Sequence, residues 1–127
     1  MANNANYSAL FQAWLNNICT AFRGELPSGE TPTGAYIIYR AYTGRFGVPF
    51  IQPLRIYVPK TSDVAEILQV LDGIDAAVGE GGVLLNSENV NVWIKKGDPF
   101  YQDMDDEKEN VKSGYVNLEI TIYQKEN

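Results

Sequence analysis

The sequence predicts an α+β fold, a two-layer sandwich in which a four-stranded mixed or antiparallel sheet carries two helices on one face. Two segments repeat apolar residues at helical spacing, and four segments are rich in β-branched and aromatic residues or alternate apolar with polar side chains. Along the chain they give the order α-β-β-α-β-β. The chain has 127 residues, 45 % of them hydrophobic, so we expect a single domain over residues 1–127.

Both helices are predicted from an apolar stripe. The first is expected to begin at a cap on Asn6 and to end near Phe22. Its stripe consists of Leu10, Phe11, Trp14, Leu15, Ile18 and Phe22. The second is expected to begin at a cap on Ser62 or Asp63 and to end at Val78, before a glycine-rich segment. Its stripe consists of Val64, Ile67, Leu68, Leu71, Ile74 and Val78.

The first two strands are predicted over Ala35–Tyr42 and Phe50–Val58, because both segments are β-branched and aromatic. The intervening Thr43–Pro49 contains the glycines and proline that a hairpin tip requires. At this tip Phe46 either contacts a partner or folds back onto the sheet edge. Pro53 cannot donate a ladder hydrogen bond, so we expect the second strand to lie at an edge or to carry a bulge.

The second half of the chain predicts two further strands and a long loop. The third strand is expected to begin at Val83–Leu85 and to continue through a kink or turn at Asn86–Asn89 into Val90–Lys95, and the fourth covers Tyr115–Tyr123. The eighteen residues of Gly97–Gly114 lie between them and have no periodicity. Loops of this length inside a compact domain are usually functional or disordered, so this segment is the main functional candidate.

Two sets of residues are candidates for contacts with other molecules. The candidate subunit or partner interface consists of Phe46, Asp98, Pro99, Phe100, Tyr101, Gln102, Asp103, Asp105, Asp106 and Glu107. The candidate exposed aromatic face consists of Trp93 and Tyr123, which alternation places on the helix-free side of the sheet. These two aromatics either form a binding surface or are covered by the long loop.

The composition excludes several kinds of chemistry. There is no histidine, which removes the usual general base and every Ser-His or Cys-His nucleophile arrangement, and the lone Cys19 excludes an internal disulfide. Asp103, Asp105 and Glu107 alternate as in a calcium loop, but Lys108 and Gly114 occupy the positions where that loop needs glycine and glutamate. We therefore expect no enzyme, catalytic residue, metal site or cofactor.

The charge and hydropathy patterns also bear on partners and location. Sixteen acidic against ten basic residues give a net charge of −6, which disfavours binding to phosphate backbones. No apolar run approaches the ~20 residues needed to cross a bilayer, and the first residues lack the basic start and apolar core of a signal peptide. We expect no membrane association and synthesis in a reducing cytoplasm.

Four runs, taken in order and with their spacing, carry a resemblance to a known family. They are Ala35–Tyr39, Gln52–Tyr57, Gly97–Gln102 followed by acidic residues, and Gly114–Glu119. Together with the amphipathic first helix and the capped second helix, they resemble the small tail terminator and minor capsid proteins of long-tailed bacteriophages. The resemblance spans about Tyr36 to Tyr123, and its motifs are diffuse.

The resemblance implies a protein that assembles on the head-proximal end of a phage tail tube as a homo-hexameric ring, ends tube growth and allows head-tail joining. Its implied partners are copies of itself, the tail tube protein and the head completion protein, while DNA passes without specific binding. The implied location is the virion, at the tail-head junction, after assembly in the bacterial host cytoplasm. The alternatives are a head completion or connector protein, and a small ligand- or peptide-binding α+β domain.

The acidic segment Asp103–Glu109 has two possible roles in such a ring. It either lines the bore, where it would let DNA pass, or pairs with a neighbouring subunit. Pairing needs a basic counterpart, and the sequence offers only scattered cations: Arg40, Arg45, Arg55, Lys95 and Lys96. The sequence leaves the two roles open.

Overall fold

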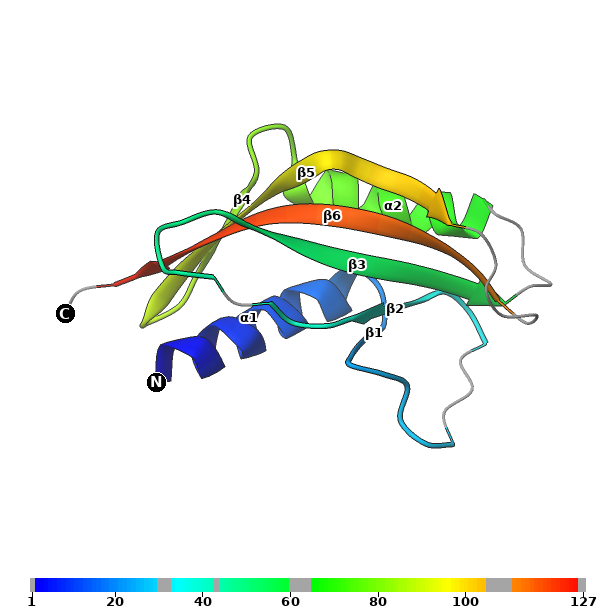
Figure 1. Cartoon of the computed structure of the whole chain (residues 1–127), viewed down its shortest axis with the longest axis horizontal. Coiled ribbons are helices and arrows are strands. Elements are labelled where there is room, and N and C mark those ends of the chain that lie inside the picture. The colour runs from blue at the N-terminus through cyan, green and yellow to red at the C-terminus, as the bar shows by residue number, and fades with distance from the viewer. Residues whose placement is uncertain (1, 30–32, 43, 60–64, 105–110, 126–127) are drawn as a thin grey trace.

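A computed structural model describes residues 2–29, 33–42, 44–59, 65–104 and 111–125 (Figure 1). It contains two helices and six strands. In chain order these are α1 (Ala2–Ile18), β1 (Ala21–Arg23), β2 (Tyr36–Tyr39), β3 (Phe50–Pro59), α2 (Ala65–Val78), β4 (Val83–Asn86), β5 (Val90–Met104) and β6 (Val111–Gln124). No helix in these ranges is both long enough and apolar enough to span a membrane.

All six strands belong to one mixed sheet in the order β1-β2-β3-β6-β5-β4. The β1–β2 pair is parallel, and every other neighbouring pair is antiparallel. The sheet curls into a half-barrel, as the long arcs of β3, β5 and β6 show in Figure 1. The fold is therefore α+β, but the predicted sandwich of four strands with two helices on one face is wrong.

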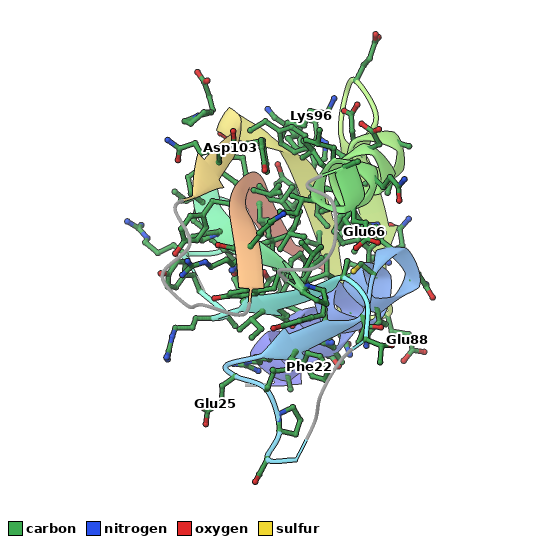
Figure 2. All side chains as sticks on the ribbon, turned by 90° about the vertical axis from the view of Figure 1, so that its right-hand side faces the viewer. Phe22, Glu25, Glu66, Glu88, Lys96 and Asp103 are labelled. Atoms are coloured by element: carbon green, nitrogen blue, oxygen red, sulfur yellow. The ribbon has the colours of Figure 1, made fainter. Side chains whose placement is uncertain are left out.

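The core fills the concave side of the curled sheet. Alternate residues of the three long strands point inward, because successive side chains of a strand face opposite sides. They meet Tyr7, Phe11 and Leu15 of α1 and Ile67 and Ile74 of α2 in one hydrophobic cluster. Figure 2 looks along the sheet and shows the strands curving around one side of the molecule and both helices on the other. The convex side of the sheet is left without a helix.

Two strands were not predicted as such. β1 has three residues and pairs with β2 through Ala21, Phe22 and Arg23, so α1 ends at Ile18 and the predicted extension of the helix to Phe22 is wrong. The helix also begins at Ala2, before the expected cap at Asn6. β4 is a separate strand that folds back on β5 as an antiparallel hairpin, and does not continue into β5. The turn at Ser87 is closed by hydrogen bonds between Ser87 and Val90.

The predicted eighteen-residue loop is the largest error in the sequence-based fold. β5 runs on to Met104 and β6 begins at Val111, so most of Gly97–Gly114 belongs to a long hairpin. The β5–β6 ladder is interrupted by a register shift between Lys96 and Tyr101, and the Asp98–Pro99 peptide bond within it is cis. Pro99 lies inside this interruption of the ladder, so its lack of a backbone N–H leaves no ladder hydrogen bond unmade. Pairing resumes at Tyr101 opposite Val116.

The expectation for Pro53 is also wrong, because β3 is a central strand with a continuous register to β6. The proline is tolerated because the β2–β3 ladder covers only positions 55–57 of β3 and has ended before Pro53. Its carbonyl oxygen accepts a hydrogen bond from the side-chain amide of Gln52 at 2.9 Å. The predicted second helix is found at Ala65–Val78, where Ile67, Ile74 and Val78 are buried but Leu68 is exposed. Its expected cap at Ser62 or Asp63 lies outside the described residues.

Candidate functional site

The predicted interface residues of the β5–β6 hairpin have mixed environments. Asp98, Pro99 and Gln102 are exposed, whereas Phe100 and Tyr101 are partly buried against the core. The Lys96 ammonium lies 5.5 Å from the centre of the Phe100 ring, a cation–π contact. The hairpin thus has an exposed edge, and its aromatic side chains pack against the hydrophobic core.

Tyr101 and Asp103 form a local pair near the end of the hairpin. Burial, together with the hydrogen bond to Asp103 and the charge of its carboxylate, raises the pKa of Tyr101 to about 12. The neutral phenol therefore donates a hydrogen bond to the exposed carboxylate of Asp103. The other predicted acids of this segment, Asp105, Asp106 and Glu107, lie outside the described residues.

Phe46 is half-buried and packs against the hydrophobic cluster. The turn around it folds back onto the end of β6, because the backbone N–H of Gly47 donates to the carbonyl oxygen of Ile122 at 2.7 Å. Phe46 was expected either to contact a partner or to fold back onto the sheet edge, and the geometry matches the second alternative.

An apolar patch occupies one end of the convex face. Trp93 lies directly opposite Leu84 on β4 and Thr121 on β6, and Tyr123 is the next outward-facing residue of β6. Leu84, Trp93 and Tyr123 are 51 %, 37 % and 41 % exposed. The Lys95 ammonium lies 5.0 Å from the centre of the Trp93 ring and 3.4 Å from the Glu119 carboxylate. We call Leu84, Trp93 and Tyr123 the apolar patch.

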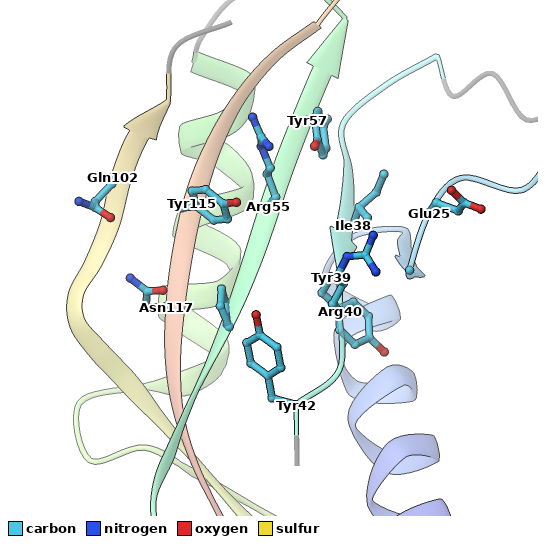
Figure 3. A pocket seen from close by; sticks show the side chains of 12 residues that line it. Glu25, Ile38, Tyr39, Arg40, Tyr42, Arg55, Tyr57, Gln102, Tyr115 and Asn117 are labelled. Carbon is cyan, nitrogen blue, oxygen red and sulfur yellow. The ribbon is translucent and has the colours of Figure 1, made fainter. Parts of the chain in front are cut away.

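A groove of about 570 Å³ lies further along the same convex face (Figure 3). Gln102 of β5, Tyr115 of β6 and Arg55 of β3 occupy consecutive positions across the sheet, and Ile38 of β2 continues the row. We define the Arg–Tyr groove by the six side chains that give it polar and aromatic character: Arg40, Tyr42, Arg55, Tyr57, Gln102 and Tyr115.

Arg55 lies at the centre of this groove and is held from several sides. Its guanidinium is 5.1 Å from the centre of the Tyr57 ring and 5.3 Å from that of the Tyr115 ring. Its Nε and Nη2 donate to the Ser113 hydroxyl at 3.3 Å and 3.2 Å. Tyr57 is in turn stacked on Tyr36 with the ring centres 5.4 Å apart. These contacts fix the direction of the cation within the groove.

Gln52 supports the side of the groove that carries Arg40 and Tyr42, and does so from the core side of the sheet. Its side chain faces the core side of β3 and is fully buried. Its amide nitrogen donates to the carbonyl oxygen of Arg40 at 2.9 Å, and its amide oxygen accepts from the backbone N–H of Tyr42 at 3.0 Å. The segment that follows β2 is therefore attached to β3, which places Arg40 and Tyr42 at the groove.

The groove has the chemistry of a recognition site for carboxylates. Two guanidinium groups, tyrosine hydroxyls and the Gln102 amide are all capable of donating to an anionic oxygen. Glu25 lies at the β1 end, at the rim beyond Arg40. Among the described residues there is no cluster of three or more Cys, Asp or Glu side chains that could hold a metal ion.

Sequence reasoning did not identify the groove. Arg40 and Arg55 were noted as scattered cations, and Tyr57 and Tyr115 were read only as strand residues. The available signal was the alternation in β3 and β6, which puts Arg55, Tyr57 and Tyr115 on the outward face. What the sequence lacked was the strand order, because β3 and β6 are adjacent only in the folded sheet.

Comparisons with family models, curated proteins and solved structures found no significant match for this chain.

Proposed function

We propose that the protein is a structural virion assembly protein that caps the head-proximal end of a phage tail tube as a ring, ends tail growth and allows head-tail joining. The observation that carries the proposal is the uncovered convex face of the sheet, with the apolar patch at one end and the Arg–Tyr groove further along it. The order and spacing of the sequence runs that resemble tail terminators supply the biological setting.

The convex face supports an assembly role because its chemistry is that of a protein contact. Interfaces combine apolar and aromatic residues with arginine, and a surrounding rim of polar groups. The apolar patch provides Leu84, Trp93 and Tyr123, and the ion pair of Lys95 with Glu119 lies beside it.

Binding of a small ligand or peptide is the second candidate, and the volume of the Arg–Tyr groove favours it. Ligand sites commonly enclose about 300 to 1,000 Å³ and combine aromatic walls with a few polar groups. Under this alternative the chain would bind a soluble carboxylate and would have no effect on tails. A thermal-shift screen with carboxylate compounds, compared between the natural chain and the Arg55→Gln variant, tests it.

The main test is deletion of the gene from the phage that carries it, followed by negative-stain electron microscopy of the lysate. We expect overlong or unjoined tails beside filled heads, and restoration of infectious particles by a plasmid copy of the gene. Normal infectious particles from the deletion would overturn the proposal.

Matched surface variants connect the phenotype to the convex face. A Trp93→Ser/Tyr123→Ser copy should fail to restore head-tail joining, because it removes the aromatic side chains of the apolar patch. Leu68→Ser is the control, since Leu68 is 43 % exposed but lies on α2. Equal complementation by the two copies would show that the apolar patch is not the assembly surface.

A further inference from the structure

We infer that a pocket between α1 and β1 binds a small, uncharged and largely apolar molecule, whose one polar atom accepts a hydrogen bond from Tyr7. The pocket lies beside α1 and not on the helix-free convex face, so the inference goes beyond the proposed function. We define the α1–β1 pocket by six of the residues that line it: Tyr7, Ser8, Ala9 and Gln12 of α1, and Ala21 and Arg23 of β1.

The first step is the size of the pocket and the chemistry of its walls. Its volume of about 800 Å³ lies within the range of about 300 to 1,000 Å³ that is usual for small-molecule sites. Ala5 and Ala9 lie one turn apart on α1, and Ala21 adds a third small side chain from β1. Phe22 and Glu25, labelled in Figure 2, line the pocket from β1 and the segment after it, and the Glu25 side chain is exposed to water. The walls therefore suit an apolar molecule.

The second step is that most polar side chains of the pocket already bond within the chain. The Arg23 guanidinium donates to the Ser8 hydroxyl at 2.8 Å, and the Arg23 side chain is otherwise exposed to water. The Tyr39 hydroxyl donates to the amide oxygen of Gln12. The amide nitrogen of Gln12 donates in turn to the carbonyl oxygen of Ala21 at 2.9 Å. These groups have partners without a ligand.

The third step is the exception, which is the hydroxyl of Tyr7. The Tyr7 side chain is 1 % exposed, and no described group donates a hydrogen bond to its hydroxyl or accepts one from it. The ring is held on two sides, because it stacks on Phe11 with the centres 5.9 Å apart and meets Phe50 edge-on at 6.3 Å. An unpartnered buried hydroxyl is unfavourable, so a ligand that supplies the missing partner gains from it.

The Tyr7 hydroxyl is also a neutral donor on the pocket side of the ring. Tyr7 lines the pocket together with Tyr39 and Arg23, and both of these neighbours act on its pKa. Burial raises this pKa most, the Tyr39 phenol raises it further and the Arg23 cation lowers it, so the phenol keeps its proton at neutral pH. An uncharged acceptor such as a ketone oxygen matches this O–H, because apolar walls disfavour the burial of a charge.

The fourth step is the state of the hydroxyl before a ligand arrives. Its oxygen is closed to solvent, so no bound water has to leave it when a ligand bonds there. A small shift of Ser8 or Gln12, which are half-buried lining residues, opens the way for the ligand oxygen. The hydrogen bond to Tyr7 then distinguishes molecules that carry an acceptor from apolar molecules of the same shape.

The first experiment compares acetophenone with ethylbenzene, two compounds that differ by a carbonyl group in place of a CH₂. Binding of each to the full chain is followed by amide shifts in NMR, which should concentrate at Ser8, Gln12 and Ala21. Tyr7→Phe should reduce the preference of the site for acetophenone over ethylbenzene about tenfold, as expected for the loss of one buried hydrogen bond. Tyr36→Phe, which removes the hydroxyl of a buried tyrosine outside the pocket, is the control and should leave the preference unchanged.

Three results of this experiment would contradict the inference. They are no binding of acetophenone to the natural chain, an equal preference in the natural chain and in Tyr7→Phe, and shifts confined to the Arg–Tyr groove. The last result would place the ligand on the convex face.

The second experiment measures stability without any ligand. Tyr7→Phe keeps the ring contacts and removes the unpartnered hydroxyl, so its melting temperature should rise although its affinity for acetophenone falls. A hydroxyl with a purely structural role would change the melting temperature in the opposite direction. A lower melting temperature in Tyr7→Phe would therefore overturn the inference.

The third experiment fills the pocket and does not depend on Tyr7. Ala9→Phe should abolish the binding of both compounds, whereas Ala13→Phe, at an exposed position of the same helix outside the pocket, should leave binding unchanged. Circular dichroism confirms that both variants are folded. Binding that survives Ala9→Phe would show that the ligand lies elsewhere. None of these measurements needs a phage, so their outcome is independent of the tail-end function.

Discussion

The side-chain amide of Gln52 donates a hydrogen bond to the carbonyl oxygen of Arg40 at 2.9 Å, from a position with no solvent exposure. The same side chain accepts from the Tyr42 N–H and donates to the Pro53 carbonyl oxygen. One buried glutamine therefore satisfies three backbone groups near the point where the β2–β3 ladder has ended, and it holds one wall of the Arg–Tyr groove.

Gln52→Leu should be strongly destabilising, because the leucine fills the space but leaves buried backbone groups without partners. We expect a loss of about 1–3 kcal/mol in the free energy of unfolding, measured by urea denaturation. Gln69→Leu on the exposed side of α2 is the matched control and should change stability by less than about 0.5 kcal/mol. Equal effects of the two substitutions would mean that the Gln52 network contributes nothing.

Gly114→Ala should destabilise the hairpin. A Cβ at Gly114 would overlap the Tyr101 hydroxyl and lie 2.6 Å from its ring, so the ring must move. We expect a cost of about 1–3 kcal/mol, as for other overpacked sites. In a Tyr101→Ala background the cost of Gly114→Ala should fall, which a double-mutant cycle measures. Gly81→Ala, which meets no atom within 4 Å, is the control.

The Tyr101–Asp103 pair predicts a specific alkaline titration. The pKa of Tyr101 is raised to about 12 from an ordinary value of 10.0, so the unfolded chain loses this proton at lower pH than the folded chain. The stability that Tyr101 contributes is complete below pH 10 and is lost as the pH rises to about 12. Ultraviolet difference absorption of tyrosinate should lose a component that titrates near pH 12 in Tyr101→Phe, and Asp103→Asn should lower the pKa of Tyr101. An unchanged titration in both variants would exclude the pair.

Cys19 should react slowly with maleimide in the folded chain. Burial raises the pKa of its thiol, and the sulfur lies 3.6 Å from the Ala35 carbonyl oxygen, so both the thiolate fraction and the access of the reagent are low. Reaction in denaturant should be faster by more than tenfold, followed by mass spectrometry. A folded-state rate equal to that of a free cysteine peptide would mean that the α1–β1 turn is open.

Several parts of the fold could be predicted from residue patterns. The second helix follows from the spacing of Ile67, Ile74 and Val78, and these residues are buried. The inward residues of β6 follow from simple alternation, and Val116, Leu118, Ile120 and Ile122 are fully buried. Patterns of this kind are local and depend only on the period of each element.

The extension of the β5–β6 hairpin was missed because its sequence has the composition of a loop. Gly97 and Pro99 interrupt the alternation of β5, and both lie at or next to the register shift between Lys96 and Tyr101, where the ladder does not require a donor. Gly114 interrupts β6 in the same way, yet it is the position over which the Tyr101 ring packs. Only the pairing partner explains these residues, and the partner is distant in sequence.

The groove was missed for a related reason. Its arginines and tyrosines come from β3, β6 and the segment after β2, and they converge because the sheet order places β6 between β3 and β5. Neither the strand order nor the curl of the sheet is encoded in the period of one strand. Cys19, in contrast, directly follows Ile18 of the helical stripe in the sequence, and in the structure it packs against the core.

The pairing of β3 with β6 at the centre of the sheet has a consequence for how the chain is made. Phe50–Pro59 must wait for Val111–Gln124, so the middle of the sheet forms only after the chain has left the ribosome as far as Gln124. Until then the apolar face of β3 lacks its main partner, and long-range pairing of this kind folds slowly. Chains that stop before β6 should therefore be substrates for proteases.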